Sequence, residues 1–159
     1  MAISYSFALA TQSSAPDVAR ELLGVGRILG VLDTSATAEG LLDGMATGLG
    51  TWILVFEAKA RPWDPVANDL GFTPTVSVTF RLDKDDDIGY QQDDLVRLVS
   101  GLLDRVPGDA VLHREFEDIW LLRRGGEVTL SEQDDIWPPH RRAALSQRFE
   151  RVTHSFSQE

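Results

Sequence analysis

The chain has 159 residues, of which 43% are hydrophobic, and this is enough apolar material for one domain with an ordinary core. Its 25 acidic and 15 basic side chains give a net charge of −10, which disfavours nucleic acid as a partner. The absence of cysteine excludes disulfides, thiolate metal ligands and a cysteine nucleophile. No apolar run approaches the length of a membrane span, and no signal-peptide pattern begins the chain. We therefore expect a soluble, cytoplasmic protein that does not bind membranes.

The N-terminal stretch predicts one strand followed by one helix. The segment ISYSFAL (3–9) places apolar residues at every second position, which is typical of a strand with one buried face. The segment 14–23 then has helical spacing of its apolar residues, with Ser14 as the cap and a proline in the first turn. We expect Gly24 and Gly26 to end this helix, because glycine lowers helix propensity.

The middle of the chain is predicted to consist mostly of strands. Strands are expected at 27–33, at 38–50 and at 51–59, the second of them weakened by its glycines. The segment 61–74 contains three prolines and is expected to be a surface loop. The clearest strand pattern in the chain follows at 75–83, where apolar and polar residues alternate regularly.

The last part of the chain predicts a second helix and then a meander. Apolar residues recur at helical spacing over 91–106 until Pro107 and Gly108 end the helix. Three more strands are expected at 110–114, 118–123 and 127–131, and a final one at 151–156. This order of elements predicts an α+β fold: a single-layer, largely antiparallel or mixed sheet with two main helices on one face. Without an interdomain linker, residues 1–159 are expected to form a single domain.

The segment RLDKDDDIGYQQDD (81–94) concentrates negative charge. Residues 83–94 of this segment carry six aspartates and one lysine, so they hold half of the net charge of the chain. Four of the carboxylates have the spacing of EF-hand calcium ligands: Asp83, Asp85, Asp87 and Asp94. However, the turn position holds Ile88 in place of glycine, and Asp94 is shorter than the usual glutamate. We therefore predict no specific calcium site and expect an exposed turn in which Asp93 or a neighbouring aspartate caps the helix.

Other candidate catalytic or metal-binding groups are few. The segment HREFE would place His113, Glu115 and Glu117 on one side of a straight strand, where they could ligate a metal. A hairpin bend is expected near 115–118, and it would scatter them. The remaining histidines lie among arginines in the tail, and no serine has a nucleophile-elbow context. The sequence thus predicts no catalytic residue, no cofactor and no metal site.

The four tryptophans fall into two kinds. Trp52 and Trp120 lie within apolar strand patterns and are expected in the core. Trp63 and Trp137 lie in loops flanked by proline, where packing over a sheet edge is the commoner role and an interface the alternative. The segment DDIWPP combines a tryptophan with two carboxylates, a combination that suits an anchor for a protein partner.

A set of segments is distinctive when taken in order and spacing: GFTPTVSVTFRLDK, DDLVRLVSGLLDRVPGDAVL, IWLLRRGGEVTL and DDIWPPHRR. Together they resemble the immunity proteins of swarming-inhibition (Sit) toxin systems and their bacterial relatives. The resemblance covers residues 50 to 142 well and the N-terminal strand and helix more loosely. It implies a small, non-enzymatic cytoplasmic protein that binds and neutralises a cognate protein toxin.

Charge and exposure then suggest which residues would contact such a toxin. The expected partner-binding residues are the acidic segment and the loop tryptophans with their neighbours: Asp83, Asp85, Asp86, Asp87, Asp93, Asp94, Trp63, Asp134, Asp135 and Trp137. An acidic surface suits a basic toxin, although other toxins need not be basic. Two alternatives remain open, a metal- or ligand-dependent enzyme and a self-associating structural or regulatory domain. The sequence does not predict the oligomeric state.

Overall fold

The computed structural model describes residues 3–157 and places the eight strands of this range in one sheet, in the order β2-β3-β4-β1-β5-β6-β7-β8. The elements are β1 (Ile3–Ala10), α1 (Ala15–Leu29), α2 (Ala38–Asp43), β2 (Met45–Ala46), β3 (Trp52–Glu57), the π-helical turn η1 (Val66–Leu70), β4 (Val76–Leu82), α3 (Ile88–Arg105), β5 (Asp109–Arg114), β6 (Asp118–Arg124), β7 (Glu127–Leu130), α4 (Pro139–Ala143) and β8 (Phe149–Arg151). All neighbouring strands are antiparallel except β7 and β8, which are parallel. The predicted α+β fold with a mostly antiparallel sheet is confirmed.

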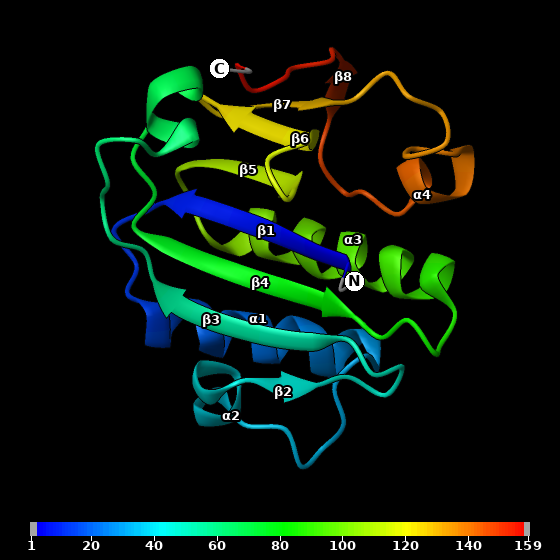
Figure 1. The fold of residues 1–159 in the computed structure, drawn as a ribbon. Helices are drawn as coiled ribbons and strands as arrows, with labels where there is room; N and C mark the ends of the chain where they lie inside the picture. The colour runs from blue at the N-terminus through cyan, green and yellow to red at the C-terminus, as the bar shows by residue number, and fades with distance from the viewer. Residues whose placement is uncertain (1–2, 158–159) are drawn as a thin grey trace.

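The two long helices lie together on one face of the sheet (Figure 1). Strand β1 runs through the middle of the sheet, between β4 and β5, and its alternation divides the two faces. Tyr5, Phe7 and Leu9 join the main core with α1 and α3, whereas Ser6 and Ala8 point to the other face. Period-2 patterning thus assigns apolar residues to the helix side and small residues to the opposite side.

Helix α1 continues beyond the glycines that were expected to end it. It runs to Leu29 and ends at Gly30, whose φ of 74° is the left-handed conformation that glycine favours. Gly26 lies within the helix because close packing requires a glycine there: a Cβ on Gly26 would lie 2.5 Å from Leu32 Cδ1. Similarly, a Cβ on Gly101 of α3 would lie 2.3 Å from the Val25 side chain of α1. These glycines allow close contacts within the helix layer, and the strand predicted at 27–33 was wrong.

Two further predicted segments differ from the structure. The strand expected at 38–50 is the short helix α2 followed by the two-residue strand β2, because Thr37 caps a helix by accepting from Gly40 N at 2.9 Å. In the tail, the final strand covers Phe149–Arg151 instead of 151–156. The loop expected at 61–74 is a loop that contains η1.

The sheet face opposite α1 and α3 is only partly covered. A second apolar cluster joins this face to the η1 segment and to the C-terminal tail: Ala8, Val66, Phe72, Val111, Ile119, Leu122 and Phe156. A cavity lies next to the η1 segment on this face, over strands β3, β4, β1 and β5. Among residues 3–157, no helix is long and apolar enough to cross a membrane.

Candidate partner-binding surfaces

The acidic turn, which we define as Asp83, Asp85, Asp86 and Asp87, connects β4 to α3. A buried side chain behind it, that of Gln91, holds the turn in place. Its amide nitrogen donates to the carbonyl oxygen of Asp83 at 2.8 Å, and its Oε1 accepts from Asp83 N at 2.8 Å. The same oxygen accepts from Thr51 Oγ1 at 2.8 Å, which joins the turn to the loop before β3. The turn is therefore preorganised.

Several carboxylates of the turn also have local structural roles. Asp83 Oδ1 accepts from Asp85 N at 3.0 Å, and Asp86 Oδ1 accepts from Asp87 N at 2.7 Å. Asp87 Oδ1 accepts from Tyr90 N at 2.9 Å and so caps α3. The prediction that an aspartate caps this helix is confirmed, and the residue is Asp87. Asp85, Asp86 and Asp87 remain exposed to solvent.

Asp93 and Asp94 lie on α3 and are paired with cations. Asp93 Oδ1 accepts from Arg141 Nε at 2.7 Å, and His140 Nε2 lies 3.2 Å from the same carboxylate. Asp94 lies 3.3 Å from Arg97, and burial raises the pKa of Asp94, an effect that the Arg97 charge opposes. Both carboxylates contribute to the fold as well as to the surface charge.

A pocket of about 410 Å³ lies beside the acidic turn. Both carboxylates and basic side chains line it: Leu49, Tyr90, Asp93, Asp94, Arg97, His140, Arg141 and Ala144. Tyr90 is 65% exposed and follows the acidic turn directly in α3. Nothing in the sequence distinguishes Tyr90, because its spacing alone does not separate it from an ordinary surface position. An exposed aromatic side chain, that of Tyr90, thus lies close to the acidic turn.

In the DDIWPP segment, Trp137 has the packing role that was the commoner expectation, and not the interface role that was the alternative. This side chain is fully buried, and its Nε1 donates to the carbonyl oxygen of Trp120 at 2.7 Å. Trp137 therefore belongs to the core, and its side chain is not available to a partner. Asp134 and Asp135 are exposed, and Asp134 lies 3.4 Å from the Arg151 guanidinium group. Trp120 is buried as predicted.

Trp63 does not lie with the acidic turn. Figure 1 shows the segment after β3 at the left end of the sheet and the acidic turn at the right end, after β4. Trp63 is 69% exposed and lines a cavity of about 450 Å³ on the face opposite α1 and α3. We call it the sheet-face cavity; it is lined by Ser6, Ala8, Phe56, Ala58, Lys59, Arg61, Trp63, Asp64, Pro65, Val66, Ser77, His113 and Phe116. The expected site residues thus divide between two surfaces.

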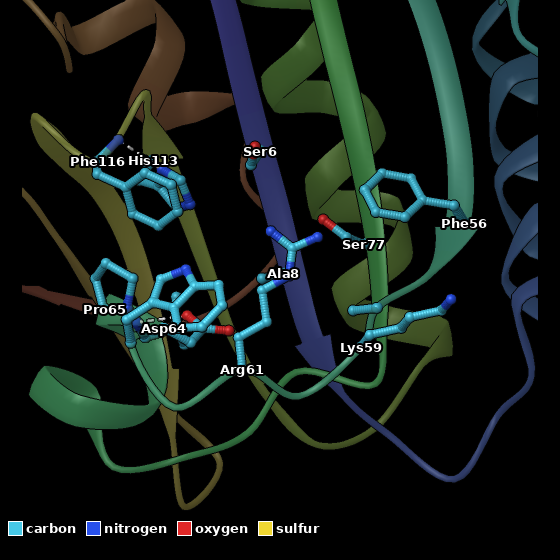
Figure 2. A pocket seen from close by; sticks show the side chains of 13 residues that line it. Ser6, Ala8, Phe56, Lys59, Arg61, Asp64, Pro65, Ser77, His113 and Phe116 are labelled. Carbon is cyan, nitrogen blue, oxygen red and sulfur yellow. Dashed lines mark hydrogen bonds between the residues drawn. The ribbon is translucent and has the colours of Figure 1, made fainter.

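The wall of this cavity is shaped by His113 at the end of β5 (Figure 2). Its Nδ1 accepts from Phe116 N at 3.1 Å, and the two rings stack with centroids 4.4 Å apart. Because Nδ1 is an acceptor, the proton of the neutral ring is on Nε2. Burial lowers the pKa of His113 to about 4, so the ring is neutral near neutral pH.

The turn after His113 also bears on the metal hypothesis for HREFE. Glu115 and Phe116 have φ values of 50° and 61°, and the hairpin bends there as expected. Within residues 3–157 no group of three or more histidine, aspartate or glutamate side chains could hold a metal ion. The turn instead presents Phe116 at the cavity wall, 48% exposed.

Both surfaces are built on one mixed sheet that carries a helix layer on one face. A family model matches residues 3–141, so the chain belongs to a family of Sit immunity proteins, as the resemblance predicted. The family is described as SitI3-like. Membership implies a non-enzymatic role and a cognate toxin as partner. Comparison with curated proteins and with solved structures gives no match.

Proposed function

We propose that this protein neutralises a cognate Sit toxin by binding it, and that the acidic turn is part of the binding surface. The family supports toxin binding, and one structural observation supports the acidic turn: exposed carboxylates are held on a preorganised loop. A loop that is already ordered loses little conformational entropy when a partner binds. The acidic turn is therefore suited to a cationic region of the toxin.

Electrostatic steering is the physical role that we assign to this surface. Asp85, Asp86 and Asp87 are exposed, and the neighbouring Lys84 offsets only one of their charges. Charges at the rim of an interface act mainly on the association rate, and salt screens them. The exposed ring of Tyr90 would then provide close contact beside the charges.

The test is to measure association of the triple variant Asp85→Asn, Asp86→Asn, Asp87→Asn with the toxin encoded beside this protein. Asparagine retains the helix cap at residue 87, so the fold should persist. We expect the association rate to fall about tenfold at about 50 mM salt and much less at about 500 mM.

A matched control removes three other exposed carboxylates: Glu39→Gln, Asp43→Asn and Glu127→Gln. This control has the same net charge as the triple variant, so it separates a local surface from the overall charge. If both variants associate with the toxin at the same rate, the acidic turn is not part of the binding surface. If the unmodified protein does not bind the toxin at all, the proposed function itself is wrong.

A further inference from the structure

The sheet-face cavity combines features that the acidic surface does not explain. Three exposed aromatic side chains surround it, with exposures of 39% for Phe56, 69% for Trp63 and 48% for Phe116. They come from three separate segments, namely the end of β3, the loop before η1 and the turn after β5. Exposed aromatic groups that gather around a hollow are typical of a binding site.

The floor of the cavity is polar and rich in hydrogen-bond donors. Ser77 of β4 is 8% exposed and contributes a hydroxyl group to the floor. Ser6, on the neighbouring strand β1, adds a second hydroxyl group. Figure 2 shows Ser6 on β1 and Ser77 on β4, with the Arg61 guanidinium group drawn across β1 near Ala8. His113 adds an Nε2–H donor at the wall.

The charge of the cavity is opposite to that of the whole chain. Lys59 and Arg61 line it, and neither forms an ion pair with any residue in the range 3–157. The single carboxylate of the lining, Asp64, already accepts from Val66 N at 2.9 Å. Two cations against one carboxylate give a local positive charge in a protein of net charge −10. A ligand carboxylate is the complementary group.

We propose that the sheet-face cavity is a second docking site for the cognate toxin, and that it takes a segment carrying a carboxylate next to an apolar side chain. The carboxylate pairs with Lys59 and Arg61, and the apolar side chain packs among Phe56, Trp63 and Phe116. The strands below the cavity are internal to the sheet, so the segment inserts side chains and does not extend the sheet. This inference rests on the proposed function.

The test compares charge removal with charge reversal in binding to the toxin encoded beside this protein. We expect Arg61→Met to weaken binding about tenfold and Arg61→Glu about a hundredfold, because reversal adds repulsion of the ligand carboxylate. Trp63→Ala should raise the dissociation rate about tenfold or more, with a smaller change in the association rate. Arg148→Glu is the matched control, since it reverses an exposed cation beside β8, and it should leave the affinity within about twofold.

The outcomes separate this inference from the proposed function. If the unmodified protein binds the toxin but Arg61→Glu binds equally well, the cavity is not a docking site and the immunity role stands. Tighter binding by Arg61→Glu would show a basic ligand and overturn the inference as well. Sedimentation of each variant tests a second copy of this chain as the occupant. A monomer–dimer equilibrium that Trp63→Ala abolishes would assign the cavity to self-association instead. Arg61 and Trp63 are exposed, so the variants should fold.

Discussion

The acidic turn and the sheet-face cavity lie at opposite ends of β4 and differ in nearly every physical property. The turn projects beyond the end of the strand, carries carboxylates and has one aromatic neighbour, Tyr90. The cavity is concave, is surrounded by aromatic side chains and carries two cations. A charged projection acts over a distance, whereas an aromatic hollow acts only at contact. In the two proposals, the acidic turn therefore attracts the partner and the sheet-face cavity retains it.

The acidic turn and the sheet-face cavity are stabilised in the same way. In each, a buried polar side chain holds a neighbouring turn by accepting hydrogen bonds from its backbone. Gln91 accepts from Asp83 N in the acidic turn, and His113 accepts from Phe116 N in the cavity wall. Gln91 is 0% exposed and His113 is 2% exposed, so in both bonds the accepting side chain is buried. The exposed groups differ, but the supports beneath them follow the same rule.

The largest expected change in stability follows from replacing Gln91, which holds the acidic turn in place. Gln91→Leu leaves the Asp83 backbone groups and the Thr51 hydroxyl without their partner, and it should lower the free energy of unfolding by about 3 kcal/mol. Urea denaturation measures this loss. Gln133→Leu is the control, because the Gln133 side chain is exposed. A loss of less than about 1 kcal/mol for Gln91→Leu would show that the turn does not depend on this side chain.

The stability that His113 contributes at the cavity wall should depend on pH. His113 has a lowered pKa of about 4 in the folded state, so between that value and its ordinary value the unfolded chain binds more protons. Stability contributed by the neutral ring is therefore present near neutral pH and is lost as the pH falls. At about pH 4.5 this loss should approach 2 kcal/mol.

The variant His113→Asn isolates this effect, because asparagine can accept from Phe116 N but does not titrate. The other charged groups around the cavity, Lys59, Arg61 and Asp64, are unchanged in it. We expect the unfolding free energy of the variant to fall less between about pH 7 and about pH 4.5 than that of the unmodified protein. Parallel pH profiles for the two proteins would contradict the assignment.

A smaller effect separates the structural and the electrostatic roles of the acidic turn. Asp87→Ala removes both the helix cap and the charge, and should lower the free energy of unfolding by about 1 kcal/mol. Asp87→Asn removes only the charge and should leave stability nearly unchanged. Thermal unfolding compares the two variants. If asparagine destabilises as much as alanine, the carboxylate charge and not the cap stabilises the start of α3.

The smallest effect on stability is expected at the most exposed aromatic group of the cavity. Trp63→Ala should change the free energy of unfolding by no more than about 0.5 kcal/mol, because most of the indole is already in water. Chemical denaturation of this variant is a direct check. A loss of several kcal/mol would mean that Trp63 is part of the core, and the cavity would then be a packing defect and not a binding surface.

Local patterns were sufficient to predict strands β1 and β4 and the position of the acidic turn. Strands β1 and β4 follow from alternation, and the capped start of α3 follows from an aspartate before a helical apolar pattern. Helix α1 was predicted too short because the reason for Gly26 is its contact with Leu32 in the folded chain. A glycine that allows close packing and a glycine that ends a helix look the same in a sequence.

The candidate site was only partly predictable, for a similar reason. The exposed aspartates are visible in the sequence, but the burial of Trp137 in the core, where it donates to the Trp120 carbonyl oxygen, follows from the tertiary fold. The cavity could not be predicted, because the pairing of β3, β4, β1 and β5 is what brings Arg61 near His113. Such neighbours follow from sheet order, which local periodicity does not determine.

Strand β1 lies in the middle of the sheet but is synthesised well before the strands that pair with it. This first strand pairs with residues 76–82 and with residues 109–113, so it has no partner until those segments have been synthesised. At a synthesis rate of about 5–20 residues per second, β1 remains unpaired for several seconds during translation. Pairing between distant segments also makes folding slow compared with helical proteins. The sheet-face cavity, whose lining includes Ser6 of β1, Ser77 of β4 and His113 of β5, therefore cannot form before this pairing is complete.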